Sequence, residues 1–182
     1  MFKRCIFTFL LLLLSSPAIA QRLSGDVIPS HYDIAVTPDL PAATFSGTER
    51  IVVTLKKPSS DIVLNAAEIE FDKVVVKSAG STAAARVTLD ATKEQATITV
   101  DRPLAAGAAE IEISYRGILN DQLRGLYLSK GNNRRYAVTQ LEATDARRMF
   151  PSFDEPAFKA TFTLSATIDN GDHAISNGAI VS

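Results

Sequence analysis

The stretch HYDIAVT at residues 31–37 alternates Tyr, Ile and Val with small or polar residues ahead of Pro38. This alternation has the period of a half-buried β-strand, whose successive side chains point to opposite faces. The pattern recurs at residues 48–55, 61–64, 69–76, 86–89, 96–100, 110–115, 125–128, 136–141 and 161–168. Short separators containing Pro, Gly, Asn, Asp or Ser divide these segments, so the sequence predicts many short strands joined by turns.

The predicted fold class is all-β. No amphipathic stretch is long enough to form a dependable helix, and short strands at near-regular spacing indicate an antiparallel β-sandwich or a pair of saddle-shaped sheets. One short helical turn is expected near residues 144–148, with Thr144 as its N-cap. Pro151 and Pro156 would prevent that turn from continuing as a helix.

The C-terminal residues predict a hairpin that is cut within its second arm. Residues 173–176 resemble a strand, Asn177-Gly178 is a strong two-residue hairpin signal, and residues 179–182 begin a return strand. We therefore expect a domain over residues 21–182 that is incomplete at its C-terminus. The alternative is a short edge hairpin that closes the domain.

The first twenty residues predict a cleaved signal peptide. Lys3 and Arg4 precede an apolar run from Cys5 to Leu14, and small residues in an A-x-A pattern end at Ala20. A membrane anchor is the alternative, but the apolar run is about half of the roughly 20 residues that a spanning helix needs. We expect export to the periplasm of a Gram-negative cell, or secretion.

Charge and cysteine content narrow the class of protein further. Without residues 1–20 the chain has 17 basic and 20 acidic residues, a net charge of about −3. The single cysteine, Cys5, belongs to the predicted signal, so the mature chain would contain none. Because basic residues do not cluster after residue 20, we expect neither nucleic acid nor a membrane as a partner. Without disulfides, one domain of this size has to depend on its hydrophobic core.

The segment with the most features of a functional site is TQLEATDARRMFPSFDEPAFKATF at residues 139–162. It resembles the signature that closes the N-terminal domain of aminopeptidase N-type zinc metallopeptidases, in which a T-Q-x-E strand leads through an A-R turn into F-P-x-F-D-E-P-x-x-K-A-x-F. Further similarities are PSHYD at 29–33, FSG at 45–47, GLY at 125–127 and SNG at 176–178. The resemblance spans essentially the whole chain after the signal.

Two positions depart from the family pattern. Leu141 occupies a position where an aromatic residue is frequent, and Ser152 occupies one where cysteine is frequent. Neither side chain would react with a substrate, and the absence of a thiol suits an exported protein.

Gln140 and Glu142 are the candidate substrate-binding residues. Residues two apart in a strand share a face, so a carboxylate beside a carboxamide would form an acceptor site for the partly cationic N-terminus of a peptide. The alternative is that both are ordinary solvent-facing strand residues. The resemblance implies that Glu142 holds the α-amine of the substrate and that Gln140 lines the first side-chain subsite.

We expect the other conspicuous residues of this segment to be structural. Asp154 and Glu155 lie in a proline-bounded loop, where acidic residues commonly cap backbone N–H groups or pair with cations such as Arg147 or Arg148. The aromatic residues are expected in the core or at a domain interface; they are Phe150, Phe153, Phe158 and Phe162.

Catalytic zinc generally requires three protein ligands, and the resemblance implies an H-E-x-x-H helix with a more distant glutamate. The only histidines are His31 and His173, and neither belongs to such a motif. We therefore expect no catalytic residue and no zinc ligand here, with zinc bound only by the complete enzyme.

The predicted function is the N-terminal domain of an exported zinc aminopeptidase that removes N-terminal residues from peptides, inactive unless joined to its catalytic domain. As a fragment it would expose the face that meets this domain and would self-associate. Two alternatives remain: a secreted β-sandwich that binds or scaffolds other molecules, and a catalytically silent relative.

Overall fold

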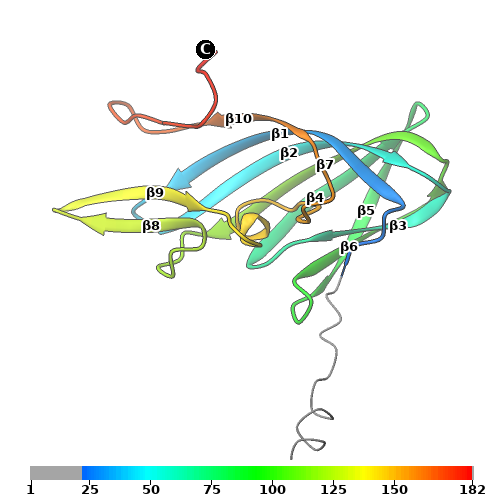
Figure 1. Cartoon of the computed structure of the whole chain (residues 1–182), viewed down its shortest axis with the longest axis horizontal. Helices are drawn as coiled ribbons and strands as arrows, with labels where there is room; N and C mark the ends of the chain where they lie inside the picture. The colour runs from blue at the N-terminus through cyan, green and yellow to red at the C-terminus, as the bar shows by residue number, and fades with distance from the viewer. Residues whose placement is uncertain (1–21, 182) are drawn as a thin grey trace, which may run out of the picture.

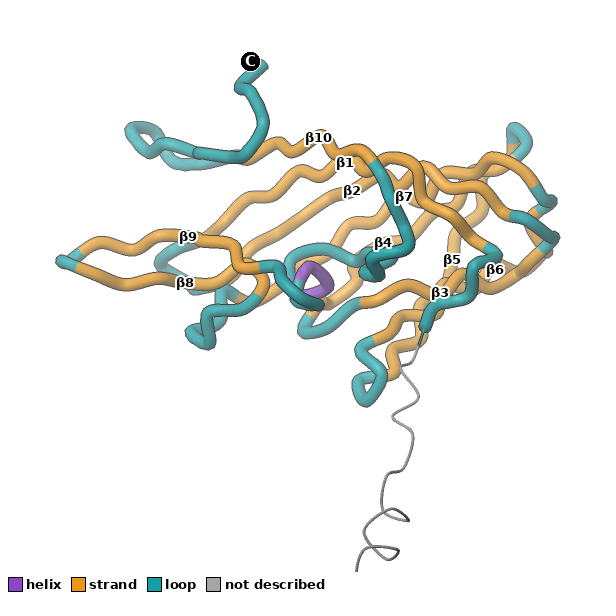
Figure 2. Tube along the Cα trace, viewed as in Figure 1, coloured by secondary structure: helices purple, strands orange, loops and turns teal. Residues whose placement is uncertain are grey.

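The computed structural model describes residues 22–181 and confirms an all-β architecture (Figures 1 and 2). The strands are β1 (Val27–Asp39), β2 (Thr44–Leu55), β3 (Ser59–Asn65), β4 (Ile69–Ser78), β5 (Ser81–Asp90), β6 (Gln95–Leu104), β7 (Gly107–Ile118), β8 (Gly125–Gly131), β9 (Arg134–Gln140) and β10 (Thr161–Ala166). A single 3₁₀ turn, η1 (Ala146–Arg148), is the helical element of this part of the chain.

Eight strands form one sheet in the order β10-β1-β2-β7-β4-β5-β6-β3, and β8 and β9 form a separate hairpin. In this order, every strand from β1 onward pairs with the next one in antiparallel fashion, as the sequence predicts. At the other edge, β10 pairs with β1 in parallel. The sheet is therefore mixed and not purely antiparallel, because the return from β9 through η1 brings β10 alongside β1 in the same direction.

The sheet becomes two layers because β5 changes its partner. Residues 81–84 of β5 pair with β4, whereas residues 85–90 pair with β6. The run of three alanines at residues 83–85 lies at this change, and such strands make the corners of sandwiches. Figure 1 shows the long strands β1, β2, β7 and β4 on one side of the molecule and β3 and β6 turned toward their inner face.

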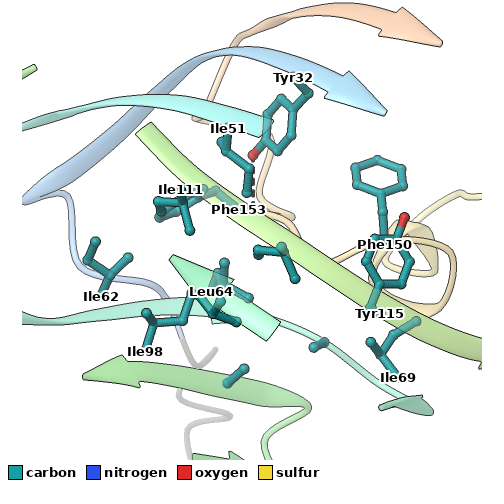
Figure 3. Packing of buried hydrophobic residues seen from close by; sticks show 14 of the residues in the cluster. Tyr32, Ile51, Ile62, Leu64, Ile69, Ile98, Ile111, Tyr115, Phe150 and Phe153 are labelled. Carbon is teal, nitrogen blue, oxygen red and sulfur yellow. Dashed lines mark hydrogen bonds between the residues drawn. The ribbon is translucent and has the colours of Figure 1, made fainter. Parts of the chain in front are cut away.

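One hydrophobic core lies between these layers. Ile62 and Leu64 of β3 and Ile98 of β6 join Ile51 of β2 and Ile111 of β7 in a single buried cluster (Figure 3). Each is at most 1% exposed. Inward side chains alternate with outward polar ones along these strands, which is the pattern from which the strands were predicted.

Two sequence-based predictions of local structure are wrong. No strand or hairpin forms within residues 167–181, where every residue is exposed, so the predicted hairpin at Asn177-Gly178 is absent there. The helical turn exists, but its N-cap position is Asp145 and not Thr144, and no side chain caps it. Within residues 22–181 no helix has the length and apolar character needed to cross a bilayer. The predicted signal peptide lies outside the described residues.

Candidate functional site

The β8–β9 hairpin positions Gln140. Asn132 and Asn133 both have positive φ, 48° and 62°, at the tip between the paired residues Gly131 and Arg134. Two-residue hairpin turns of type I′ require positive φ at both central positions, which asparagine tolerates. From this tip, β9 runs back along β8 and ends at Gln140, directly opposite Gly125. The hairpin projects from one end of the molecule (Figure 1).

Gln140 and Glu142 are both exposed to solvent, whereas Leu141 between them is half-buried and packs against the core. The strand was predicted to include Leu141, but β9 ends at Gln140, so Glu142 stands in the turn that follows it. The peptide bond between Glu142 and Ala143 is cis. Both residues are thus exposed, but one lies at the strand end and the other in the turn after it, and not at two positions on one strand.

Neither candidate side chain has a partner within residues 22–181: no hydrogen bond or ion pair joins the side chain of Gln140 or Glu142 to another described residue, although the backbone of Gln140 pairs with Gly125. Their neighbours differ in this respect. Every other charged side chain between residues 139 and 155 is paired; these are Asp145, Arg147, Arg148, Asp154 and Glu155. The segment therefore presents one carboxylate and one carboxamide to solvent on a stretch whose other charged side chains are ion-paired or, for Glu155, hydrogen-bonded to a backbone N–H.

A tight turn carries Glu142 into η1. The backbone N–H of Asp145 donates to the carbonyl of Leu141 over 2.9 Å, and the N–H of Met149 donates to the carbonyl of Ala146 over 2.9 Å. Consecutive turns of this kind leave the backbone between Leu141 and Met149 little freedom. Figure 2 shows this short helical segment beside the base of the β8–β9 hairpin.

Arg147 connects the segment to the body of the sheet. Its guanidinium lies 2.9 Å from Asp154 Oδ2 and 3.3 Å from Glu94 Oε2, and its side chain is only 11% exposed. The backbone carbonyl of Arg147 also accepts a hydrogen bond of 3.0 Å from the N–H of Ala67. This arrangement confirms the prediction that Asp154 pairs with a nearby arginine.

Arg148 is surrounded by carboxylates. Nε contacts Asp145 Oδ1 at 2.9 Å, Nη1 contacts Glu68 Oε1 at 2.8 Å and Nη2 contacts Glu94 Oε1. Burial disfavours the charged guanidinium, but the hydrogen bond to Asp145 and the charges of Glu68 and Glu94 outweigh this effect and raise the pKa of Arg148. Sequence reasoning missed Glu68 and Glu94, because they lie more than fifty residues away along the chain.

The rest of the signature segment anchors it to the core. Asn65 and Ser152 form an isolated antiparallel bridge, with backbone hydrogen bonds of 2.7 and 2.9 Å. The N–H of Phe153 donates to the hydroxyl of Tyr32 over 3.1 Å. Glu155 accepts a hydrogen bond from the backbone N–H of Leu23, as predicted for an acidic residue in this loop.

The aromatic residues behave largely as expected. Phe150 and Phe153 are buried in the core, and Phe158 is half-buried with its ring centroid 5.8 Å from that of Phe153. Phe162 of β10 stacks on Tyr32 with ring centroids 5.0 Å apart, yet 58% of it remains exposed. The core face of the sheet thus continues onto β10, where part of it is open to solvent.

One strand of the sheet carries a buried carboxyl group. Glu49 of β2 is 4% exposed, and neither of its oxygens has a hydrogen-bond partner among residues 22–181. Burial disfavours the charged carboxylate and raises the pKa of Glu49 well above its usual value. Sequence reasoning missed Glu49, although its place on the same face of β2 as Phe45 and Ile51 could have indicated this inward position.

The described residues do not fit a zinc site. No group of three or more His, Cys, Asp or Glu side chains within residues 22–181 is arranged to hold a metal ion. His31 lies in β1, with Nδ1 2.7 Å from Thr161 Oγ1 and Nε2 3.0 Å from Asp33 Oδ1. His173 is exposed and lies outside any regular element.

Comparison with known proteins identifies the domain. The model of the Peptidase M1 N-terminal domain matches residues 28–182. Aminopeptidase M1-C of Oryza sativa subsp. japonica is 39% identical over 160 residues, which cover 86% of this chain and 18% of that protein. Alanine/arginine aminopeptidase of Saccharomyces cerevisiae is 36% identical over 155 residues, which cover 80% of this chain and 18% of that protein. Aminopeptidase N of Acetobacter pasteurianus is 35% identical over 163 residues, which cover 87% of this chain and 45% of that protein.

The chain thus spans about a fifth of the length of most of these relatives and less than half of the one from Acetobacter pasteurianus. The matched region includes the strands, the β8–β9 hairpin and the segment of residues 139–162. The chain belongs to the Peptidase M1 N-terminal domain family, as the resemblance of its signature segment predicts.

Proposed function

We propose that this chain is the N-terminal domain of an exported zinc aminopeptidase and that it binds the α-amine of the peptide substrate through Glu142, with Gln140 lining the adjoining side-chain subsite. The observation that carries the proposal is that these two side chains are exposed and unpartnered, while the charged residues around them are paired. The names of the relatives support an aminopeptidase activity for the complete protein.

The chemistry of the two residues suits an ammonium group. The carboxylate of Glu142 supplies a negative charge and two acceptor oxygens, and the carboxamide of Gln140 adds a third acceptor. A binding site for the amine at a fixed distance from the reacting centre also selects the bond that is cleaved, because only the first peptide bond of the substrate can then reach that centre. Zinc would be bound outside residues 22–181 and would supply the activated water of a metallopeptidase.

The open face at β10 supports the expectation that a further domain packs against this one. Phe162, Leu164 and Ile168 are 58%, 47% and 40% exposed. Side chains of this size are commonly covered in a mature protein. This chain by itself should therefore self-associate, which sedimentation velocity over a range of concentrations would detect as a rising mass; a constant monomer mass would contradict it.

Export rests on the sequence of residues 1–20. Cleavage after Ala20 would leave Gln21 as the first residue of the mature protein. N-terminal sequencing of the protein recovered from the periplasm or medium tests this, and recovery of an uncleaved protein from the cytoplasm would reject export.

Activity is tested in the complete polypeptide that carries this domain. Incubation with a peptide of mixed sequence should release residues one at a time from the N-terminus, as mass spectrometry would show. Glu142→Gln should lower turnover far more than it lowers zinc content. Release of internal fragments, or no cleavage by a zinc-loaded protein, would reject the proposed function and favour a binding module.

A further inference from the structure

Three parts of the chain that are distant in sequence converge on the guanidinium of Arg148. Glu68 lies between β3 and β4, Glu94 lies between β5 and β6, and Asp145 immediately precedes η1. Each accepts a contact from a different nitrogen of Arg148, whose side chain is only 10% exposed. Arg148 therefore joins two turns of the large sheet to the segment that follows β9.

Two short paths lead from Arg148 to the candidate substrate-binding residues. Arg148 Nε holds the carboxylate of Asp145, and the backbone N–H of Asp145 closes the turn onto the carbonyl of Leu141, so Glu142 lies inside this turn. On the other side, the Cβ of Arg148 packs against Gly125, which is the direct partner of Gln140 in the hairpin.

We propose that Arg148 is a positioning residue that fixes Gln140 and Glu142 relative to the large sheet. This inference rests on the proposed function, because it assigns a role in the same amine-binding site. Arg148 does not touch the substrate in this account. It acts by holding the turn and the strand end that present the two side chains.

The geometry explains why this position needs arginine. The guanidinium has a rigid planar fork that directs donors to several acceptors at once, whereas lysine offers a single ammonium on a flexible stem. Arg148→Lys would keep the charge but could not reach three carboxylates in three directions. At least one carboxylate of the half-buried cluster would lose its partner, which is costly for a desolvated charge.

The test uses the complete aminopeptidase and compares Arg148→Lys with Ile111→Val. Ile111 is fully buried in β7 between Ile51 of β2 and Val76 of β4 and takes part in none of the contacts of Arg148, so its truncation by one methylene lowers stability without removing those contacts. We expect Arg148→Lys to raise KM on the order of tenfold to a hundredfold with zinc content unchanged and a smaller effect on kcat. Ile111→Val should leave KM unchanged even if it lowers the melting temperature as much as Arg148→Lys does.

Hydrogen exchange gives a readout that does not depend on substrate. Peptides covering residues 140–149 should exchange faster in Arg148→Lys than in the native enzyme, and exchange in the same peptides should be unchanged in Ile111→Val. Should Arg148→Lys not fold, Glu68→Gln provides a milder test, because Glu68 is the most exposed of the three carboxylates and accepts one contact. It should change KM and exchange in the same direction.

The outcomes separate the two proposals. A lowered kcat/KM in Glu142→Gln together with an unchanged KM and unchanged exchange in Arg148→Lys and Glu68→Gln would overturn the role of Arg148 and leave the proposed function intact. An unchanged kcat/KM in Glu142→Gln would overturn the amine-binding function, and with it this inference, even if exchange in residues 140–149 rises.

Discussion

Gly125 and Arg148 pack so closely that a β-carbon at position 125 would lie 2.5 Å from the Cβ of Arg148. Gly125 has a φ of 65°, in the left-handed region that residues with a side chain rarely adopt. It is also the first residue of β8 and the partner of Gln140. The base of the hairpin can therefore rest against η1 only while residue 125 is glycine.

Gly125→Ala should destabilise the domain by at least about 1–2 kcal/mol, which is the typical cost of the left-handed conformation for a residue with a β-carbon. The contact with Arg148 would add to this cost. Urea unfolding monitored by circular dichroism measures the effect. Gly131→Ala at the other end of β8 is the matched control, because a β-carbon there meets no atom within 4 Å; equal stability of the two variants would contradict the packing.

The stability of the domain should respond differently to loss of the hydroxyl group at each of two buried tyrosines. The hydroxyl of Tyr115 has no hydrogen-bond partner among residues 22–181, so Tyr115→Phe should leave stability unchanged or raise it. The hydroxyl of Tyr32 accepts the N–H of Phe153, and Tyr32→Phe would leave that buried donor unpaired at a cost of about 1–3 kcal/mol. Unfolding of both variants in urea measures the difference, and a larger loss for Tyr115→Phe would contradict the account.

The buried carboxyl of Glu49 should make stability depend on pH. Because burial raises its pKa in the folded state above the ordinary value of 4.5, the folded form binds more protons than the unfolded form at every pH between the two values. Below the unfolded value the group is neutral in both states and carries no ionisation cost. As pH rises above about 4.5, its contribution should therefore reduce stability, on the order of 1 kcal/mol for each pH unit until the folded pKa is reached.

Glu49→Gln isolates this contribution, since glutamine has nearly the same shape and does not titrate. The stability of the variant minus that of the native protein should grow as pH rises from 5 to 8, when both are unfolded in urea at each pH. A difference that stays constant over this range would show that Glu49 does not hold a raised pKa in the folded domain.

The strands could be predicted because the information for them is local. The alternation in residues 31–37 corresponds to the inward Tyr32, Ile34 and Val36 of β1, and these three are buried as the pattern requires. The parallel pairing of β1 with β10 could not be predicted in this way, since it joins His31 to Thr161 across the whole domain. The failed hairpin shows the converse: Asn177-Gly178 permits a turn, but Ile175 beside it is 95% exposed, so no apolar face stabilises strands on either side.

The candidate site was predicted in part. The exposure of Gln140 and Glu142 followed from the sequence, and the pairing of Asp154 with Arg147 was anticipated from their proximity in the chain. The contacts of Arg148 with Glu68 and Glu94 depend on how two distant turns fold over η1, which no local pattern encodes. Whether Glu142 binds an amine stays a prediction.

The most direct measurement of that role combines a change in the protein with a change in the substrate. In the complete enzyme, kcat/KM is measured for a peptide with a free α-amine and for the same peptide lacking it, with native protein, Glu142→Gln and the exposed control Glu70→Gln. We predict that Glu142→Gln loses about 2–3 kcal/mol, roughly 30-fold to 150-fold in kcat/KM, on the amine substrate only, so that the preference for the amine collapses. An undiminished preference for the amine in Glu142→Gln would contradict the account.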